Sequence, residues 1–129
     1  MNNKEVKEKY TEIKLEMYEG VVEAEFGWKV EAIGWLDILE PFEKGKVPDG
    51  FVEKLRNLYN NGIIIMTMGF HECEFCIDEK RSDIAKSSIE KLLRDEENKI
   101  EYIFPEMIFH YMEEHNFKPS NAFINFVIR

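Results

Sequence analysis

The chain contains few cysteines, no long apolar run and no secretion signal. Two cysteines in 129 residues cannot form a disulfide framework. No segment approaches the roughly 18 consecutive apolar residues that a membrane-spanning helix needs. Residues 1–20 alternate charged and apolar side chains and lack the continuous apolar stretch of a signal peptide. We therefore expect a cytoplasmic protein with reduced thiols and no membrane association.

Basic residues are also scarce relative to acidic ones. The sequence has 17 lysines and arginines against 26 aspartates and glutamates, which gives a formal net charge of −9. Nucleic acids and anionic membrane surfaces bind clustered lysine and arginine, so neither is an expected partner. The acidity has two explanations. It keeps the protein soluble, or it forms an acidic face that captures a basic protein partner such as a toxin or an enzyme.

The length and the apolar content predict one domain that builds its own core. A chain of 129 residues buries about two-thirds of the surface that it exposes when unfolded. Hydrophobic residues make up 44% of the sequence, and no linker or internal repeat interrupts it. We expect a single domain over residues 1–129, frayed over residues 1–10. A bound metal would add to this core without replacing it.

The N-terminal third predicts strands followed by an irregular connection. Residues 11–17 favour a strand after a frayed helix or tail, although helical spacing is also present. Residues 22–30 alternate apolar and mostly charged side chains, the clearest half-buried strand in the chain, and we expect the two strands to pair as a hairpin. Two prolines and three glycines make residues 34–50 an irregular segment, whose apolar side chains should hold it on the core.

The middle of the chain predicts a helix and then a strand. The apolar residues of 51–59 lie on one helical face, and the Asn-Asn-Gly sequence at 60–62 ends the helix. Residues 63–68 form a short apolar run with β-branched side chains, which predicts a buried strand. This strand leads directly to Gly69.

The C-terminal part predicts one further strand and two helices around an ambiguous segment. Residues 88–93 fit either a helix or a strand that turns at 95–98. Residues 100–104 have the composition of a strand, and the helix expected at 105–115 starts with Pro105. A short helix follows Pro119. These elements predict an α+β fold: a small, mainly antiparallel sheet with two or three helices packed on one side.

Every cysteine and histidine lies in one of two short clusters. Residues 69–76 contain His71, Cys73 and Cys76, and residues 109–115 contain His110 and His115. A Cys-x-x-Cys turn and a His-x₄-His pair are spacings that Zn²⁺ sites use. The 33 residues between Cys76 and His110 exceed a zinc-finger spacing, so the site would clasp distant segments of one domain. His110 and His115 reach one ion only if the helix ends near His115.

The five residues offer one candidate more than a tetrahedral zinc site needs. If Cys73, Cys76, His110 and His115 bind the ion, the site is closed and structural. If His71 is a ligand, one of the later histidines stays free to act as an acid or a base. A third possibility is a metal-free protein with ordinary buried cysteines and histidines. A redox Cys-x-x-Cys fits poorly, because the glutamates on either side of Cys73 raise the thiol pKa.

These observations support two classes of function. The leading hypothesis is a non-catalytic, zinc-stabilised interaction module, in one version an immunity-type protein that neutralises a basic toxin. The alternative is a small zinc-dependent hydrolase in which Glu72 or Glu74 assists a zinc-bound water. Four protein ligands indicate a structural site, and three ligands plus water indicate catalysis.

Several motifs occur in the same order as in an uncharacterised family of small bacterial proteins. They are Gly34-Trp35-Leu36-Asp37, Pro41-Phe42, Gly45, Val47-Pro48, Gly69-Phe70-His71, Cys73, Cys76, His110-Tyr111, His115, Phe117 and Pro119. The chain resembles this family over residues 33–127, which implies a shared fold and candidate site but no assigned activity. The resemblance also implies a strand over residues 87–93. It leaves the N-terminal 30 residues outside the family region, as a segment peculiar to this chain.

Overall fold

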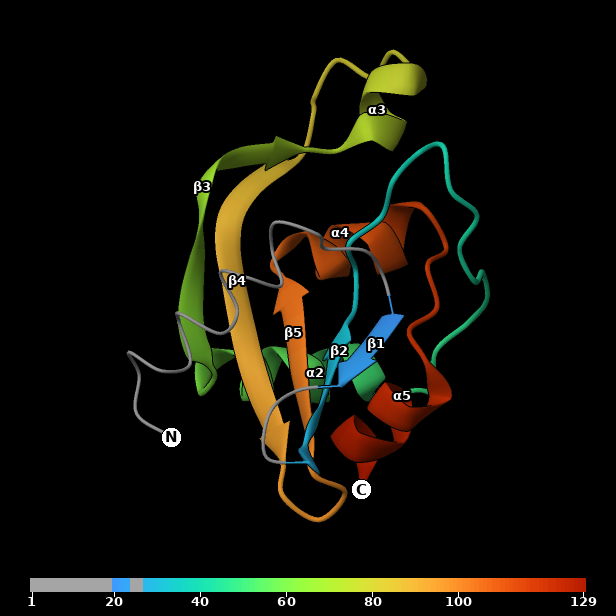
Figure 1. The fold of residues 1–129 in the computed structure, drawn as a ribbon. Coiled ribbons are helices and arrows are strands. Elements are labelled where there is room, and N and C mark those ends of the chain that lie inside the picture. The colour runs from blue at the N-terminus through green and yellow to red at the C-terminus, as the bar shows by residue number, and fades with distance from the viewer. Residues whose placement is uncertain (1–19, 24–26) are drawn as a thin grey trace.

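A five-stranded sheet forms the centre of the computed structural model, which describes residues 20–23 and 27–129 (Figure 1). The strand order is β1-β2-β5-β4-β3. The strands are β1 (Gly20–Glu23), β2 (Lys29–Ala32), β3 (Ile63–Glu72), β4 (Lys86–Asp95) and β5 (Ile100–Pro105). β2 and β5 run parallel, and the other neighbouring pairs are antiparallel. The predicted mainly antiparallel sheet is confirmed.

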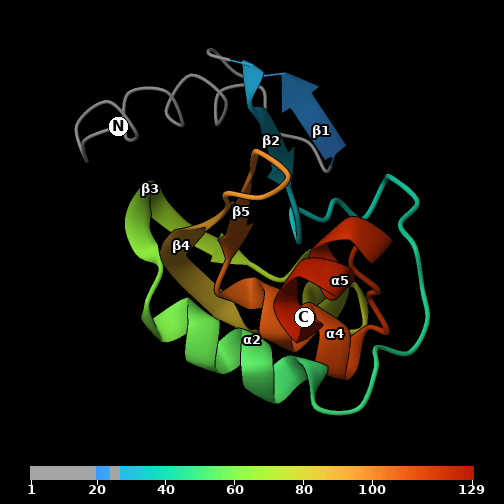
Figure 2. The same ribbon diagram turned by 90° about the horizontal axis from the view of Figure 1, so that it is seen from below.

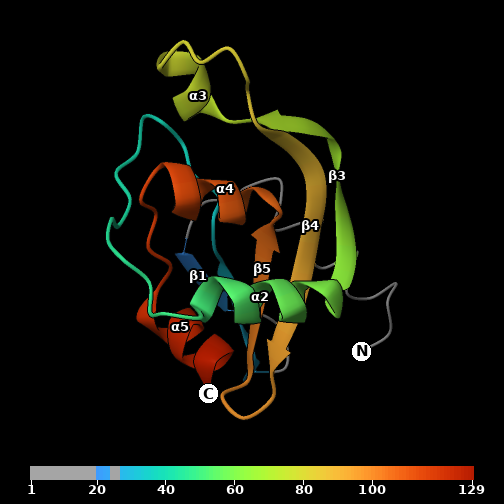
Figure 3. The ribbon, with the colours of Figure 1, turned by 180° about the vertical axis from the view of Figure 1, so that it is seen from behind.

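Three helices cover one face of this curled sheet. They are α2 (Phe51–Asn60), α4 (Met107–Glu114) and α5 (Asn121–Ile128), and they lie together on the same side in Figures 2 and 3. The short helix α3 (Glu74–Asp78) stands at the end of β3. The α+β fold class is therefore confirmed.

Aromatic side chains fill the space between the helices and the sheet. Phe51 of α2, Phe104 of β5 and Phe123 of α5 are each fully buried. The ring of Phe123 lies 6.2 Å from that of Phe51 and 5.0 Å from that of Tyr102, measured between centroids. These rings place the centre of the core between α2, α5 and β5.

Several predicted elements are confirmed. α2 begins at Phe51 and ends at the Asn-Asn-Gly stop, and α5 begins after Ser120 with its predicted apolar face buried. The ambiguous segment is a strand, β4, which turns through residues 96–99 into β5. The connection at 34–50 lacks helix and extended strand, and Leu36, Phe42 and Val47 pack against the core as expected.

The prediction of one strand over residues 22–30 is wrong. β1 ends at Glu23 and β2 begins at Lys29, and the two pair with each other as an antiparallel hairpin. Gly27 has a φ of 75°, a left-handed conformation that interrupts an extended chain and that glycine adopts without cost. The predicted strand at 11–17 and the frayed end at 1–10 lie outside the described residues.

Two further boundaries differ from the prediction. β3 continues beyond residue 68 to Glu72, with a shift in its pairing with β4 between Met66 and His71. Pro105 is the last residue of β5, so α4 begins at Met107 and not at residue 105. Within residues 20–23 and 27–129, no helix has the length and apolar character that crossing a membrane requires.

Candidate metal centre

The first pair of candidate ligands lies in the turn that joins β3 to α3. Cys73 caps the N-terminus of α3, and its sulfur accepts a hydrogen bond from the backbone N–H of Cys76 at 3.4 Å. The backbone N–H of Cys73 donates to the carbonyl of Ala85, at 2.8 Å, just before β4 begins. The turn is therefore fixed to the sheet, and it directs both sulfurs to the same side, as a zinc knuckle requires.

The second pair comes from the end of α4. His110 lies within the helix, whereas His115 follows its last residue and has φ −128° and ψ 14°. Asn116 then adopts a left-handed φ of 58°, and the Tyr111 carbonyl accepts hydrogen bonds from the N–H groups of His115 and Phe117 at 3.0 and 3.1 Å. This end of the helix turns the His115 ring toward His110, so the Nε2 atoms lie 3.2 Å apart.

The four side chains converge on one point. Each offers a ligand atom within 4.8 Å of the other three. Cys73 Sγ lies 3.4 Å from His115 Nε2, and Cys76 Sγ lies 3.2 Å from His110 Nε2 and 3.7 Å from His115 Nε2. A tetrahedral zinc ion at its usual bond lengths separates sulfur from nitrogen by about 3.6 Å and two nitrogens by about 3.3 Å. The observed separations are close to the edges of such a tetrahedron.

Hydrogen bonding alone does not satisfy this arrangement. His115 Nε2 has three close polar neighbours: the sulfurs of Cys73 and Cys76 and the Nε2 atom of His110. A neutral imidazole nitrogen either donates one proton or accepts one. A cation at the centre would be bound by all four lone pairs at once, so the donor set fits a metal better than a hydrogen-bonded cluster.

Most of the cluster is removed from solvent. Cys73 is 0% exposed, Cys76 1% and His115 8%, whereas His110 is half-buried. Burial raises the pKa of the Cys73 thiol to about 11, and burial also lowers the pKa values of His110 and His115. The histidines are thus neutral at pH 7, as ligands must be, and the thiols would give up their protons to a bound cation.

A shell of aromatic and charged side chains surrounds the cluster. The Phe75 ring lies 5.2 Å from that of His115. Nδ1 of His115 lies 3.7 Å from a carboxylate oxygen of Glu79, the kind of partner that orients a metal-binding imidazole. Arg81 joins Glu79 and Glu114 through contacts of 2.6 and 3.2 Å. The sequence did not reveal Glu79 and Arg81, because no spacing rule marks residues that support a ligand.

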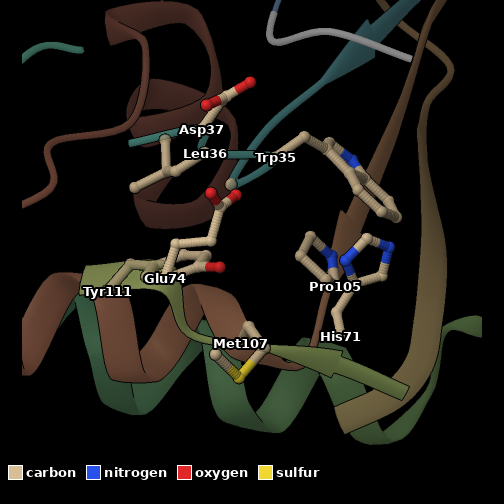
Figure 4. Close-up of a pocket in the computed structure, with 9 residues that line it drawn as sticks. Trp35, Leu36, Asp37, His71, Glu74, Pro105, Met107 and Tyr111 are labelled. Atoms are coloured by element: carbon tan, nitrogen blue, oxygen red, sulfur yellow. The ribbon is translucent and has the colours of Figure 1, made fainter. Parts of the chain in front are cut away.

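His71 is the fifth candidate, and it lies apart from the other four. It is exposed near the end of β3, with its ring centroid 6.3 Å from that of Trp35 (Figure 4). Among the described residues, the group of potential ligands consists of Cys73, Cys76, His110 and His115. His71 instead lines a neighbouring pocket.

The surroundings of Cys73 also argue against a redox-active pair of Cys73 and Cys76. Reactive Cys-x-x-Cys thiols have lowered pKa values, because a helix N-terminus or a nearby cation stabilises the thiolate. Cys73 does cap a helix, but burial raises its pKa to about 11. The thiol without a bound cation therefore stays protonated at pH 7 and is poorly suited to nucleophilic attack.

Comparisons with known proteins give a family and no activity. No curated protein and no solved structure matches the chain significantly. A family model matches residues 7–128. This match starts well before residue 33, so the expectation that the N-terminal 30 residues lie outside the family region is wrong. The chain belongs to the family described as Domain of unknown function (DUF7919).

Proposed function

We propose that this chain is a non-catalytic interaction module whose fold is clasped by a zinc ion bound to Cys73, Cys76, His110 and His115. The observation that carries the proposal is the convergence of two sulfurs and two imidazole nitrogens within 4.8 Å. Two thiolates and two imidazoles are a donor set typical of structural zinc. Softer thiolate ligands also disfavour Mg²⁺ and Ca²⁺, which prefer oxygen.

A structural role follows from the number of ligands. A catalytic zinc ion usually keeps one position for water or substrate, whereas structural sites are closed by four protein ligands. Here four potential ligand atoms lie within 4.8 Å of one another, and three of the four side chains are buried, which supports a closed site. The proposed ion would tie the β3–α3 turn to the end of α4, two segments far apart in the chain.

The charge of the chain supports a basic protein as the partner. Its formal net charge is −9, and exposed carboxylates stand beside the cluster in the sequence. Glu72 and Glu74 flank Cys73, and Glu113 and Glu114 precede His115. A concentration of negative charge attracts a basic surface and accelerates its association. An immunity-type protein that neutralises a basic toxin is one version of this proposal.

Metal analysis of protein purified without a histidine tag tests the zinc site. We expect about one zinc per chain, and replacement by Co²⁺ should give the intense visible bands of a tetrahedral thiolate site. Octahedral cobalt spectra or a metal-free protein of unchanged stability would contradict the proposal.

Binding of basic proteins tests the partner class. A cationic protein should bind the zinc-loaded chain with an affinity that falls steeply between low and physiological salt. A neutral protein of similar size serves as the control. Equal binding of both, or binding insensitive to salt, would contradict an electrostatic interaction module.

A further inference from the structure

A small pocket opens beside the proposed zinc site. It has a volume of about 190 Å³ and lies between the connection that follows β2, the end of β3, and α4 (Figure 4). Drug-sized ligands occupy pockets of about 300–1,000 Å³. This pocket is too small for such a ligand and is large enough for one amino-acid side chain.

Two acceptor groups point into the pocket. The Glu74 carboxylate and the Tyr111 hydroxyl both face its centre (Figure 4). Tyr111 is only 6% exposed, and no group in residues 20–23 and 27–129 forms a hydrogen bond with its hydroxyl. The hydroxyl oxygen is not among the fully buried side-chain atoms that lack a partner, so it is the part of this buried side chain that is open to the pocket. A polar group of a ligand that enters the pocket can therefore hydrogen-bond to this hydroxyl in place of water.

The remaining lining favours a cation with an apolar stem. None of the lining residues is lysine or arginine, and Asp37 adds negative charge at the rim, where its carboxylate points away from the pocket centre and accepts a hydrogen bond from the Leu39 backbone N–H at 2.8 Å (Figure 4). The indole of Trp35 forms one wall, fixed by the hydrogen bond that its Nε1–H donates to the Ile103 carbonyl at 3.3 Å. An aromatic wall attracts a cation through its ring face. Leu36 and Met107 supply apolar contacts for methylene groups.

We propose that this pocket receives an arginine side chain of the basic protein partner. The guanidinium donates hydrogen bonds to the Glu74 carboxylate and the Tyr111 hydroxyl, its plane lies against Trp35, and its methylenes contact Leu36 and Met107. Arginine fits better than lysine, because its planar group presents several donors at once and stacks on aromatic rings.

The shape of the pocket depends on the proposed zinc site. Glu74 directly follows Cys73, and Tyr111 directly follows His110, so a bound ion would fix the backbone from which both acceptors project. The inference rests on the proposed function, because the arginine is assigned to the basic partner. Zinc content and arginine binding are nevertheless separate measurements, so the two proposals can fail independently.

Titration of zinc-loaded full chain with a capped Gly-Arg-Gly tripeptide tests the inference by NMR. We expect saturable shifts of the Trp35 indole N–H signal, assigned with Trp28→Phe, and none with the neutral isostere Gly-citrulline-Gly. Glu74→Gln should weaken binding about ten-fold and Tyr111→Phe about five-fold, the effects of one charged and one neutral hydrogen bond. Glu53→Gln removes the same charge from an exposed position on α2, outside the pocket, and should leave the affinity unchanged.

Three results would overturn the inference. The first is an equal response to the arginine and citrulline peptides. The second is equal weakening by Glu74→Gln and Glu53→Gln, which would show a general effect of charge. The third is binding of methylguanidinium without binding of the tripeptide, which would assign the pocket to a free small cation. The zinc content and thermal stability of each variant, measured in parallel, distinguish loss of the pocket from loss of the proposed zinc site.

Discussion

At the scale of single residues, His110 and His71 have the same side chain in different surroundings. His110 Nε2 lies 3.2 Å from Cys76 Sγ and 3.2 Å from His115 Nε2. His71 is exposed, and its ring lies beside Trp35. Of these two histidines, only His110 can share an ion with both cysteines. This difference gives a matched pair of variants.

We expect His110→Ala to abolish stable zinc binding and to lower the free energy of unfolding by about 4 kcal/mol or more, the range seen when a structural metal is lost. His71→Ala should keep about one zinc per chain and change stability by less than about 0.5 kcal/mol, as is usual for exposed positions. Metal analysis and urea unfolding measure both effects. Loss of zinc in His71→Ala with retention in His110→Ala would reverse the assignment of ligands.

A buried carboxylate at the end of β4 makes stability depend on pH. The side chain of Asp95 is 1% exposed. Burial by itself raises its pKa, but hydrogen bonds from Asn98 and the guanidinium of Arg129 outweigh burial and lower the pKa below 3.8. The folded state thus binds the proton less readily than the unfolded state. The resulting stability is complete above pH 3.8 and is lost as the pH falls through the lowered pKa.

Asp95→Asn should therefore reduce the free energy of unfolding at pH 7 by about 1.5–3 kcal/mol, the contribution of hydrogen bonds to a charged group. The difference between Asp95→Asn and the unmodified chain should stay constant down to about pH 5 and shrink below the ordinary aspartate pKa. Urea unfolding over this range measures it. A difference that grows as the pH falls would contradict the sign of the shift.

At the scale of elements, the connection from β2 to α2 depends on one glycine. Gly34 has a φ of 84°, and a Cβ atom there would lie 3.1 Å from two side-chain carbons of Ile108 and 3.3 Å from Pro105 Cδ. This close approach holds the connection against the start of α4. Gly50 has a similar φ of 82°, but a Cβ atom there would meet no described atom within 4 Å.

The two glycines separate backbone strain from crowding. Gly50→Ala should cost about 1–2 kcal/mol, from the left-handed conformation alone. Gly34→Ala should cost about 1–3 kcal/mol more, because Ile108 must move within a packed core. Thermal or urea unfolding of both variants gives the difference. Equal costs would show that the connection relaxes away from α4 without penalty.

At the scale of the whole molecule, the two cysteines of the proposed zinc site belong to the same buried core as the central aromatic rings. The core residues Phe51, Phe104 and Phe123 lie between α2, α5 and β5. The cluster lies where α3 meets the end of α4. The aromatic rings packed against β5 do not contact the proposed ion, so we expect removal of the ion to loosen the region around α3 before the sheet.

A chelator should lower the melting temperature by about 10 °C or more, since a ligand that binds only the folded state stabilises it. Hydrogen exchange should accelerate at the N–H groups of Cys76, Ile77 and His115, whereas the amides of β4 and β5 should keep their protection. Exchange followed by NMR with and without chelator measures this pattern. Unchanged protection around α3 would contradict a structural ion.

Local sequence patterns determined most of the elements and the identity of the candidate ligands. The Asn-Asn-Gly stop ended α2, the Ser120 cap began α5, and Asn116 took the left-handed conformation that ends the helix before it reaches His115. These signals are local, because they depend on the backbone preferences of a few adjacent residues. The pattern over residues 22–30 predicts one continuous strand, because the alternation continues across Gly27 and does not reveal the left-handed conformation that separates β1 from β2.

Only the tertiary structure decided which histidine stays outside the cluster and what that histidine does instead. His71 is only two residues from Cys73 in the sequence, yet the direction of β3 places it beside Trp35. Three features depend on segments far apart in the chain. They are the distances between the sulfur and nitrogen atoms of the cluster, the contact between Glu79 and His115, and the Tyr111 hydroxyl, which has no hydrogen-bond partner in the described part of the chain. Distances between such segments are set by packing of the whole core, which no local pattern encodes.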